Sequence, residues 1–203
     1  MSLDGFIAPE GMDLDHADDF EYKNWMSNWT ELQKWTEGQR FFRENLGLGE
    51  GGETGADNQL MEESFDRTGV SIMGKRMFDG GEMFWPEEAP FHTPVFVVTH
   101  QQREPWVRPG GTTFYFVNDG IESALDQARE AAGPKDIRIA GGGKMISQYL
   151  AAGLIDELTI SLSPVVFGGG TPLFGEGSEA ASLEITHVID SPLVTHVQYR
   201  PRT

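Results

Sequence analysis

The chain has no cysteine, no long apolar run and few basic residues. The absence of cysteine excludes disulfides and thiolate metal sites. No stretch of about 18 apolar residues is present, so the sequence predicts no membrane span. A charged and then apolar leader is also lacking at the start of the sequence, so we expect a cytoplasmic protein.

Acidic side chains dominate the charge of the sequence. There are 32 acidic and 15 basic residues among 203, which gives a formal net charge of −17 at pH 7. Nucleic acids and anionic membranes both attract basic surfaces, so this composition argues against either partner. The apolar content of 38% suffices for one sizeable core, and the length predicts a single domain over residues 1–203.

The first third of the chain has an aromatic part and a glycine-rich part. Tyr22, Trp25, Trp29 and Leu32 have the spacing of one helix face, which predicts an amphipathic helix. We expect these aromatic rings to pack on the core or on a second subunit rather than on a cofactor. Residues 46–57 read LGLGEGGETGAD, a composition typical of a mobile loop.

From residue 69 onward, strand and helix patterns alternate. Asn118 or Asp119 offers an N-cap for a predicted helix over residues 121–132, and Gly153 ends a second predicted helix over residues 144–152. After Gly153 only strand patterns follow, which predicts an α/β fold with a mostly parallel sheet and antiparallel C-terminal strands. The predicted strands are residues 70–73, 94–99, 113–117, 137–140, 158–163, 183–189 and 194–199, and the predicted helices are residues 121–132 and 144–152.

A glycine triplet stands between a predicted strand and a predicted helix. Gly141, Gly142 and Gly143 follow a short apolar run and precede Lys144 and Met145. Glycines let the backbone approach a phosphate closely, and the first N–H groups of a helix point at the anion. The triplet fits neither the G-x-G-x-x-G fingerprint nor the P-loop pattern. We expect a phosphate-binding turn of another kind, with a plain structural turn as the alternative.

Two further motifs lie where predicted strands end. Gly74, Lys75 and Arg76 follow the first of these strands, and adjacent cations at such a place suit a phosphate ester. Thr99 and His100 end the next strand, at the edge where open α/β sheets bind ligands. Thr99 could bond a phosphate or a ribose, and His100 could stack on a ring or pair with a phosphate. The alternatives are a solvated helix start and a surface histidine.

Two loops carry weaker signals. Residues 168–170 are three glycines between predicted C-terminal strands, and we interpret them as a flexible hairpin loop, with a wall of the substrate site as the alternative. Asp4 and Gly5 favour a sharp turn near the start of the chain. No Ser-His-Asp arrangement can be recognised. The five histidines show no metal-ligand spacing, so no metal site is predicted.

The order of these motifs resembles the dihydrofolate reductase-like superfamily. The segments SLDGFIA, GKRMF, PVFVVTH, IAGGGKMISQYL and DELTISLSPVVFGGGTPLF follow one another as in its riboflavin-biosynthesis reductase branch, the C-terminal domain family of bacterial bifunctional deaminase-reductases. The resemblance covers the start of the chain and residues 68–200. It implies a three-layer α/β/α fold, NADPH as cofactor, a small-molecule substrate and a homodimer, with the helix around Trp25 and Trp29 as a candidate interface.

The resemblance also assigns cofactor-binding roles, because the family binds NADPH across the carboxyl ends of its central sheet. The implied contacts are Gly141, Gly142, Gly143, Lys144 and Met145 with the pyrophosphate, Gly74, Lys75 and Arg76 with the adenosine-side phosphates, Thr99 and His100 near the 2′-phosphate, and Ile7 and Ala8 beside the nicotinamide.

The sequence departs from the family pattern in three places. Met77 stands where many relatives have a threonine that contacts phosphate. Residues 36–66 are longer and more acidic than in the family, so we expect an acidic helical and loop insertion there. The family's first strand lies mostly before SLDG, so we expect residues upstream of Met1.

The motifs together predict an NADPH-dependent reductase that transfers hydride to a small heterocycle of pyrimidine or pterin type. The resemblance is to 5-amino-6-(5-phosphoribosylamino)uracil reductase. Asp15, Asp19 and Glu21 lie in a plausible region for a proton donor, but no motif supports any of them. Two alternatives stay open: a nucleotide-binding structural or regulatory protein without turnover, and a true dihydrofolate reductase, against which the missing catalytic context in residues 15–35 argues.

Overall fold

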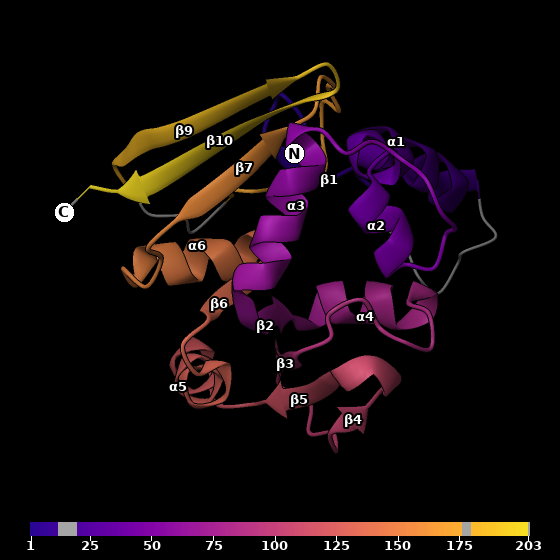
Figure 1. Ribbon diagram of the computed structural model, residues 1–203. Coiled ribbons are helices and arrows are strands. Elements are labelled where there is room, and N and C mark those ends of the chain that lie inside the picture. Colours follow the sequence, from indigo (N-terminus) through magenta and orange to yellow (C-terminus); the bar gives the residue numbers. More distant parts are fainter. Residues whose placement is uncertain (12–19, 176–179, 203) are drawn as a thin grey trace.

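The computed structural model describes residues 1–11, 20–175 and 180–202. Its largest sheet has five strands in the order β4-β5-β3-β2-β6 (Figure 1). The four strands β5, β3, β2 and β6 are parallel, and the short edge strand β4 is antiparallel to β5. The strand bounds are β2 Thr68–Gly74, β3 Pro94–Val98, β4 Trp106–Val107, β5 Thr113–Val117 and β6 Asp136–Gly141.

Helices cover both faces of this sheet, which makes three layers. Helices α5 (Ile121–Ala132) and α6 (Gly143–Ala151) bury their apolar faces against one side of β2 and β3. Helix α4 (Lys75–Phe84) packs on the other side, where the fully buried Phe78 contacts the ring of Phe114. The α/β fold class and the mostly parallel central sheet expected from the sequence are therefore confirmed.

The C-terminal strands form a separate antiparallel sheet, as expected. Its order is β7-β10-β9, with β7 at Leu158–Leu162, β9 at Leu183–Ser191 and β10 at Val194–Pro201. Because β7 does not pair with β9, the hairpin interpretation of residues 168–170 is wrong. These glycines instead lead into β8 (Thr171–Pro172), which pairs with β1 (Phe6–Ala8) near the start of the chain.

Three helices precede the central sheet: α1 (Phe20–Glu37), α2 (Arg40–Asn45) and α3 (Ala56–Arg67). The aromatic spacing correctly predicts α1, in which Trp25 stacks on Trp29 with ring centroids 5.5 Å apart. Trp25 is buried and donates from its Nε1 to the Pro9 carbonyl at 3.1 Å. This ring therefore packs on its own chain, which removes Trp25 from the expected subunit interface.

The ends of two elements differ from the sequence prediction. The N-cap of α5 is Gly120 rather than Asn118 or Asp119. The amide of Asn118 instead donates to the carbonyls of Thr99 and Gln101, which ties the end of β5 to the turn after β3. A short 3₁₀ turn, η2 (Pro109–Gly111), separates β4 from β5.

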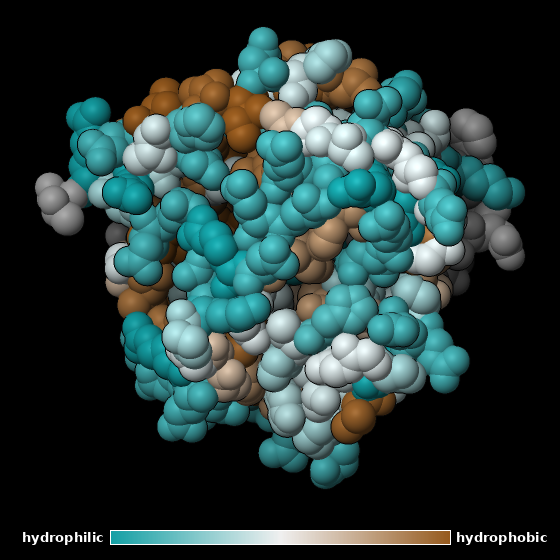
Figure 2. Space-filling model, viewed as in Figure 1, coloured by the Kyte–Doolittle hydropathy of each residue, from teal (hydrophilic) through white to brown (hydrophobic). Residues whose placement is uncertain are grey.

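No helix within residues 1–11, 20–175 and 180–202 is long and apolar enough to cross a membrane. The face in Figure 2 is mostly hydrophilic, as the net charge leads one to expect. Brown hydrophobic side chains gather at its upper left, in the area of the edge strand β9, where Ile185 and Val188 are exposed.

Candidate cofactor site at the carboxyl edge of the sheet

The three predicted phosphate motifs lie side by side at the carboxyl edge of the central sheet. Strand register pairs Met73 with Gly141 across β2 and β6, and pairs Gly74 with Val98 across β2 and β3. Neighbouring strands are about 4.8 Å apart, so the ends of three strands form one continuous edge. A Cβ placed on Gly74 would stand 3.0 Å from Cγ of Met145, which shows that the first two motifs touch.

Strand β1 lies beside the glycine triplet. A Cβ on Gly142 would lie 3.8 Å from Cδ1 of Ile7, so this side chain faces the triplet. Ala8 is farther along the same strand, where its carbonyl oxygen would stand only 2.2 Å from a Cβ on Gly170. The structure thus brings the predicted nicotinamide wall and the predicted phosphate turn together, although they are more than 130 residues apart in the sequence.

The structure explains why glycine is required at the first and third positions of the triplet. Gly141 has a φ of 133°, a backbone conformation that L side chains rarely adopt. Gly143 has no space for a side chain, because a Cβ there would lie 2.4 Å from the Pro172 carbonyl oxygen and 2.9 Å from that of Leu173. Gly142, by contrast, would meet only an ordinary van der Waals contact. The peptide bond between Gly141 and Gly142 is cis.

The start of α6 presents free donors at this edge. Gly142 is the N-cap, and its carbonyl accepts from the amides of Met145 and Ile146. The N–H groups of Gly143 and Lys144 have no acceptor among the residues that the structure describes. The Lys144 side chain is exposed and forms no ion pair within that part of the chain. A helix start with free N–H groups and a nearby cation favours an anionic ligand.

The two cations after β2 are not equivalent. Lys75 forms an ion pair with Asp79, one turn along α4, so its charge is already partly compensated. Arg76 is exposed and has no ion pair or hydrogen bond with any described residue. The sequence interpretation treats the pair as one phosphate-binding unit. The structure makes Arg76 the more available of the two.

Met77 occupies the position where the family pattern has threonine. Its Sδ lies 3.3 Å from the place of a Cβ on Gly141. The thioether therefore covers the first glycine of the triplet. The exposed fraction of Met77 is 37%, so the other side of the thioether faces solvent.

Thr99 is buried, whereas His100 is exposed. The Thr99 amide donates to the Val117 carbonyl at 3.0 Å, and its hydroxyl accepts from the Gln101 amide at 3.1 Å. The hydroxyl thus stabilises the turn after β3 and retains its own proton for donation. The ring of His100 has no hydrogen-bond partner in the described ranges. Both residues lie at the expected edge.

Asp4 joins the start of the chain to the glycine-rich loop, a role that the sequence analysis did not assign. Its carboxylate accepts from the amides of Phe167 and Gly168, the latter at 2.7 Å. A hydrogen bond from the Ser2 hydroxyl, together with these amides, holds the pKa of Asp4 below its usual value. Gly5, with φ at 92°, completes the predicted sharp turn.

The sequence of this chain also matches a known protein family. The model of the RibD C-terminal domain family matches residues 1–195. The chain belongs to this family. The resemblance found in the motif order is therefore confirmed.

Relatives of this RibD-family chain cover most of its length. It is 26% identical over 191 residues to the uncharacterized protein YwjB of Bacillus subtilis, an alignment that includes 91% of this chain and 84% of YwjB. A putative riboflavin biosynthesis protein from Shewanella sp. PV-4 has a similar structure, with a TM-score of 0.65, 23% identity and coverage of 100% of this chain and 96% of that one.

A second solved structure is that of a Thermotoga maritima diaminohydroxyphosphoribosylaminopyrimidine deaminase/5-amino-6-(5-phosphoribosylamino)uracil reductase. It has a TM-score of 0.59 and 16% identity, and it covers 99% of this chain. Only 54% of the Thermotoga chain is matched, so the present chain corresponds to about half of that protein. At 23% and 16% identity, the two structural similarities show that the chain shares the fold of these proteins.

Away from the edge, this RibD-family chain assembles a Ser-His-Asp group that the sequence analysis did not recognise. His196 lies with Nε2 3.2 Å from Asp57 Oδ1 and Nδ1 2.8 Å from Ser161 Oγ. Since a carboxylate only accepts, Nε2 carries the proton and Nδ1 accepts from the serine. Burial is the largest cause that lowers the pKa of His196. The ring is enclosed under Trp35, so the group ties α3 to the antiparallel sheet.

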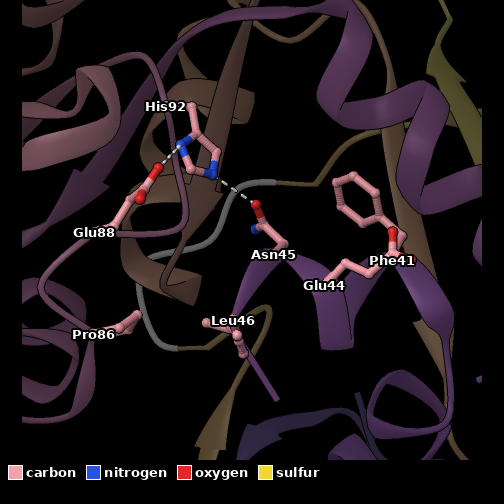
Figure 3. A pocket seen from close by; sticks show the side chains of 8 residues that line it. Phe41, Glu44, Asn45, Leu46, Pro86, Glu88 and His92 are labelled. Carbon is pink, nitrogen blue, oxygen red and sulfur yellow. Dashed lines mark hydrogen bonds and ion pairs between the residues drawn. The ribbon is translucent and has the colours of Figure 1, made fainter. Parts of the chain in front are cut away.

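A hollow of about 440 Å³ lies between α2 and the connection from α4 to β3 (Figure 3). His92 lines it, with Nε2 2.8 Å from Asn45 Oδ1 and Nδ1 3.1 Å from the Gly110 carbonyl. Glu88 approaches the same ring at 3.6 Å. Because this connection precedes β3, the hollow lies away from the carboxyl edge and is separate from the candidate cofactor site. Of the acids considered as proton donors, Asp15, Asp19 and the side chain of Glu21 lie outside the described part of the chain.

Proposed function

We propose that this chain is an NADPH-dependent reductase whose cofactor lies along the carboxyl edge of β6, β2 and β3. The observation that carries the proposal is the meeting, at one edge of a chain with a net charge of −17, of N–H groups and cations that have no partner among the described residues. The amides of Gly143 and Lys144, the Lys144 side chain and Arg76 supply these donors. Such a set suits a pyrophosphate and a further phosphate.

The residues present fit the parts of that cofactor. Gly142 has no side chain, so its backbone permits the close approach that a pyrophosphate requires. Arg76 and His100 stand at the ends of adjacent strands, where a 2′-phosphate would find charged or polar partners. Ile7 supplies an apolar side chain beside the triplet, and Ala8 follows it on β1. When bound, the cofactor would supply the hydride, and the protein would orient it and exclude water.

We further propose that the substrate is a small heterocycle of pyrimidine type. Support comes from membership of the RibD C-terminal domain family and from the Thermotoga relative, a deaminase and 5-amino-6-(5-phosphoribosylamino)uracil reductase. A homodimer is part of the same proposal, and sedimentation velocity would test it.

Binding and turnover can be tested separately. Titration with NADPH should produce energy transfer from the tryptophans, and Arg76→Ala should weaken binding by about 1–3 kcal/mol, as expected for a lost charge-assisted hydrogen bond. Arg200→Ala is the matched control, because Arg200 is exposed on β10 and also lacks an ion pair within the described ranges. Equal affinity of the wild type and Arg76→Ala would refute the assignment of Arg76.

A second assay follows NADPH oxidation with aminopyrimidine, pterin and flavin substrates. Oxidation with an aminopyrimidine would support the proposed substrate class. Tight NADPH binding without oxidation of any of them would favour a nucleotide-binding protein without turnover. The position of Met77 favours this second function, because its thioether covers Gly141 where the family pattern places a hydroxyl.

A further inference from the structure

Arg138 is a partly buried cation on β6 without an anionic partner in the described part of the chain. Its Nε is enclosed and has no hydrogen-bond acceptor. Its guanidinium lies 4.5 Å from the centre of the Phe65 ring of α3. Burial lowers the pKa of Arg138 to about 10, so the side chain still carries its charge at neutral pH. A buried charge is costly unless it is paired and hydrogen-bonded.

Ser71 presents a second unsatisfied polar group beside it. Strand register pairs Ser71 directly with Arg138 across β2 and β6, so both side chains lie on the same face of the sheet. Ser71 is 1% exposed, and its Oγ has no hydrogen-bond partner. The enclosed Ser71 hydroxyl and the enclosed Nε of Arg138 lie on neighbouring strands and both lack a partner among the described residues, and a group with acceptor oxygens would satisfy both.

This pair lies close to the candidate cofactor site. Ala140 follows Arg138 on the same strand and the same face, about 6.6 Å farther along, and Gly141 comes next. The face is the one that α3 and α4 cover, because Phe65 of α3 lies against Arg138 and Ala140 packs in the cluster around Phe78 of α4. A small substrate held beside the glycine triplet on this face could therefore extend one end toward Arg138.

We propose that Arg138 and Ser71 bind an anionic oxygen group of the substrate, a carboxylate or a phosphate ester. A guanidinium can contact two oxygens of such a group at once, and the serine hydroxyl can donate to a third lone pair. The inference rests on the proposed function, since it gives the reductase a substrate with one charged end. Arg138 is then a specificity-determining residue, separate from the cations that we assign to the cofactor.

Benzoate is the probe for this site, and benzamide, which has the same shape without the charge, is the control ligand. Calorimetry would compare the wild type with Arg138→Met, Arg138→Lys and Ser71→Ala. Arg129→Met is the control variant, because Arg129 is exposed on α5 and pairs with Asp126. We expect benzoate but not benzamide to bind the wild type and Arg129→Met, and Arg138→Met to bind benzoate at least tenfold more weakly.

Arg138→Lys and Ser71→Ala keep the test informative if the methionine variant folds poorly. Both should weaken benzoate severalfold, because each retains the positive charge but loses part of the hydrogen bonding. NADPH affinity, measured on the same variants, should stay within twofold of the wild type.

Three results would overturn the inference: no benzoate binding to the wild type, equal binding of benzoate and benzamide, or benzoate affinity unchanged in all three variants at the site. If NADPH binds normally in these cases, the proposed function stands and only the anionic subsite fails. If NADPH does not bind but benzoate still depends on Arg138, the proposed function fails and the anion site is supported.

Discussion

Substitution of Gly143 by alanine tests the packing of the glycine triplet in isolation from any ligand. The new Cβ would stand 2.4 Å from the Pro172 carbonyl oxygen, 2.9 Å from the Leu173 carbonyl oxygen and 3.2 Å from Leu173 Cα. All three atoms are backbone, so no flexible side chain can move away. Either α6 or β8 must shift.

The magnitude follows from two opposing terms. Overpacking of a tight site costs about 1–3 kcal/mol. Alanine in place of glycine gains up to about 1 kcal/mol of helix propensity, and less in the first turn. With contacts this short the overpacking term wins, and we expect Gly143→Ala to lose about 2 kcal/mol. In a chain of this size that corresponds to a fall in melting temperature of roughly 4–8 °C.

Thermal unfolding followed by circular dichroism, without cofactor, is the assay. Gly38→Ala is the matched control, because the nearest atom to its Cβ would be the Trp35 carbonyl oxygen at 4.0 Å. The control should stay within about 0.5 kcal/mol of the wild type. If Gly143→Ala melts within about 1 °C of the wild type, then α6 does not pack on residues 172–173 as described.

Three other perturbations have definite expected outcomes. Burial lowers the pKa of His196 below its usual 6.5, so the neutral ring contributes its full share to the free energy of unfolding above about pH 6.5. This contribution should be lost as the pH falls from there through the folded-state pKa. Denaturant titrations at several pH values should show the loss in the wild type and not in His196→Gln. Tyr149→Phe removes a buried hydroxyl that donates at 2.8 Å to a carbonyl of α5, so it should cost about 1–3 kcal/mol in urea unfolding, whereas the exposed Tyr115→Phe should cost little. Asp4→Asn should speed hydrogen exchange at the Gly168 amide, and unchanged exchange would contradict the described bond.

The sequence predicts the main elements of the sheet well, for physical reasons. Buried parallel strands need unbroken runs of β-branched and aromatic residues, and residues 113–117 match β5 at both ends. Glycines in the left-handed region mark helix ends clearly, as Gly133 and Gly153 do at the ends of α5 and α6. The two-residue strands β4 and β8 carry no such pattern, because their pairing depends on distant segments.

The motifs of the candidate site can be predicted from the sequence, but which of their charged side chains form ion pairs within the protein was not predicted. Strand ends can be recognised locally, so the positions of Gly74, Thr99 and Gly141 at one edge follow from a parallel sheet. The ion pair of Lys75 with Asp79 has an i,i+4 spacing that the sequence displays, and this signal could have separated Lys75 from Arg76.

Other features depend on contacts that no local pattern contains. The hydrogen bonds of His196 join residues 35 and 139 positions apart in the sequence. The burial of Arg138 depends on α3 folding over β6, because an arginine within a strand pattern is ordinarily expected on a solvated face. The packing of Gly143 against residues 172–173 likewise appears only once β8 has paired with β1.

The central claim is that NADPH lies along the carboxyl edge of the sheet, and amide chemical shifts during an NADPH titration test it most directly. The account predicts that the largest shifts fall on residues 74–76, 99–100 and 141–145, and that Arg76→Ala needs a higher cofactor concentration to reach the same shifts. Shifts confined to the hollow around His92, or no saturable shift at all, would contradict it.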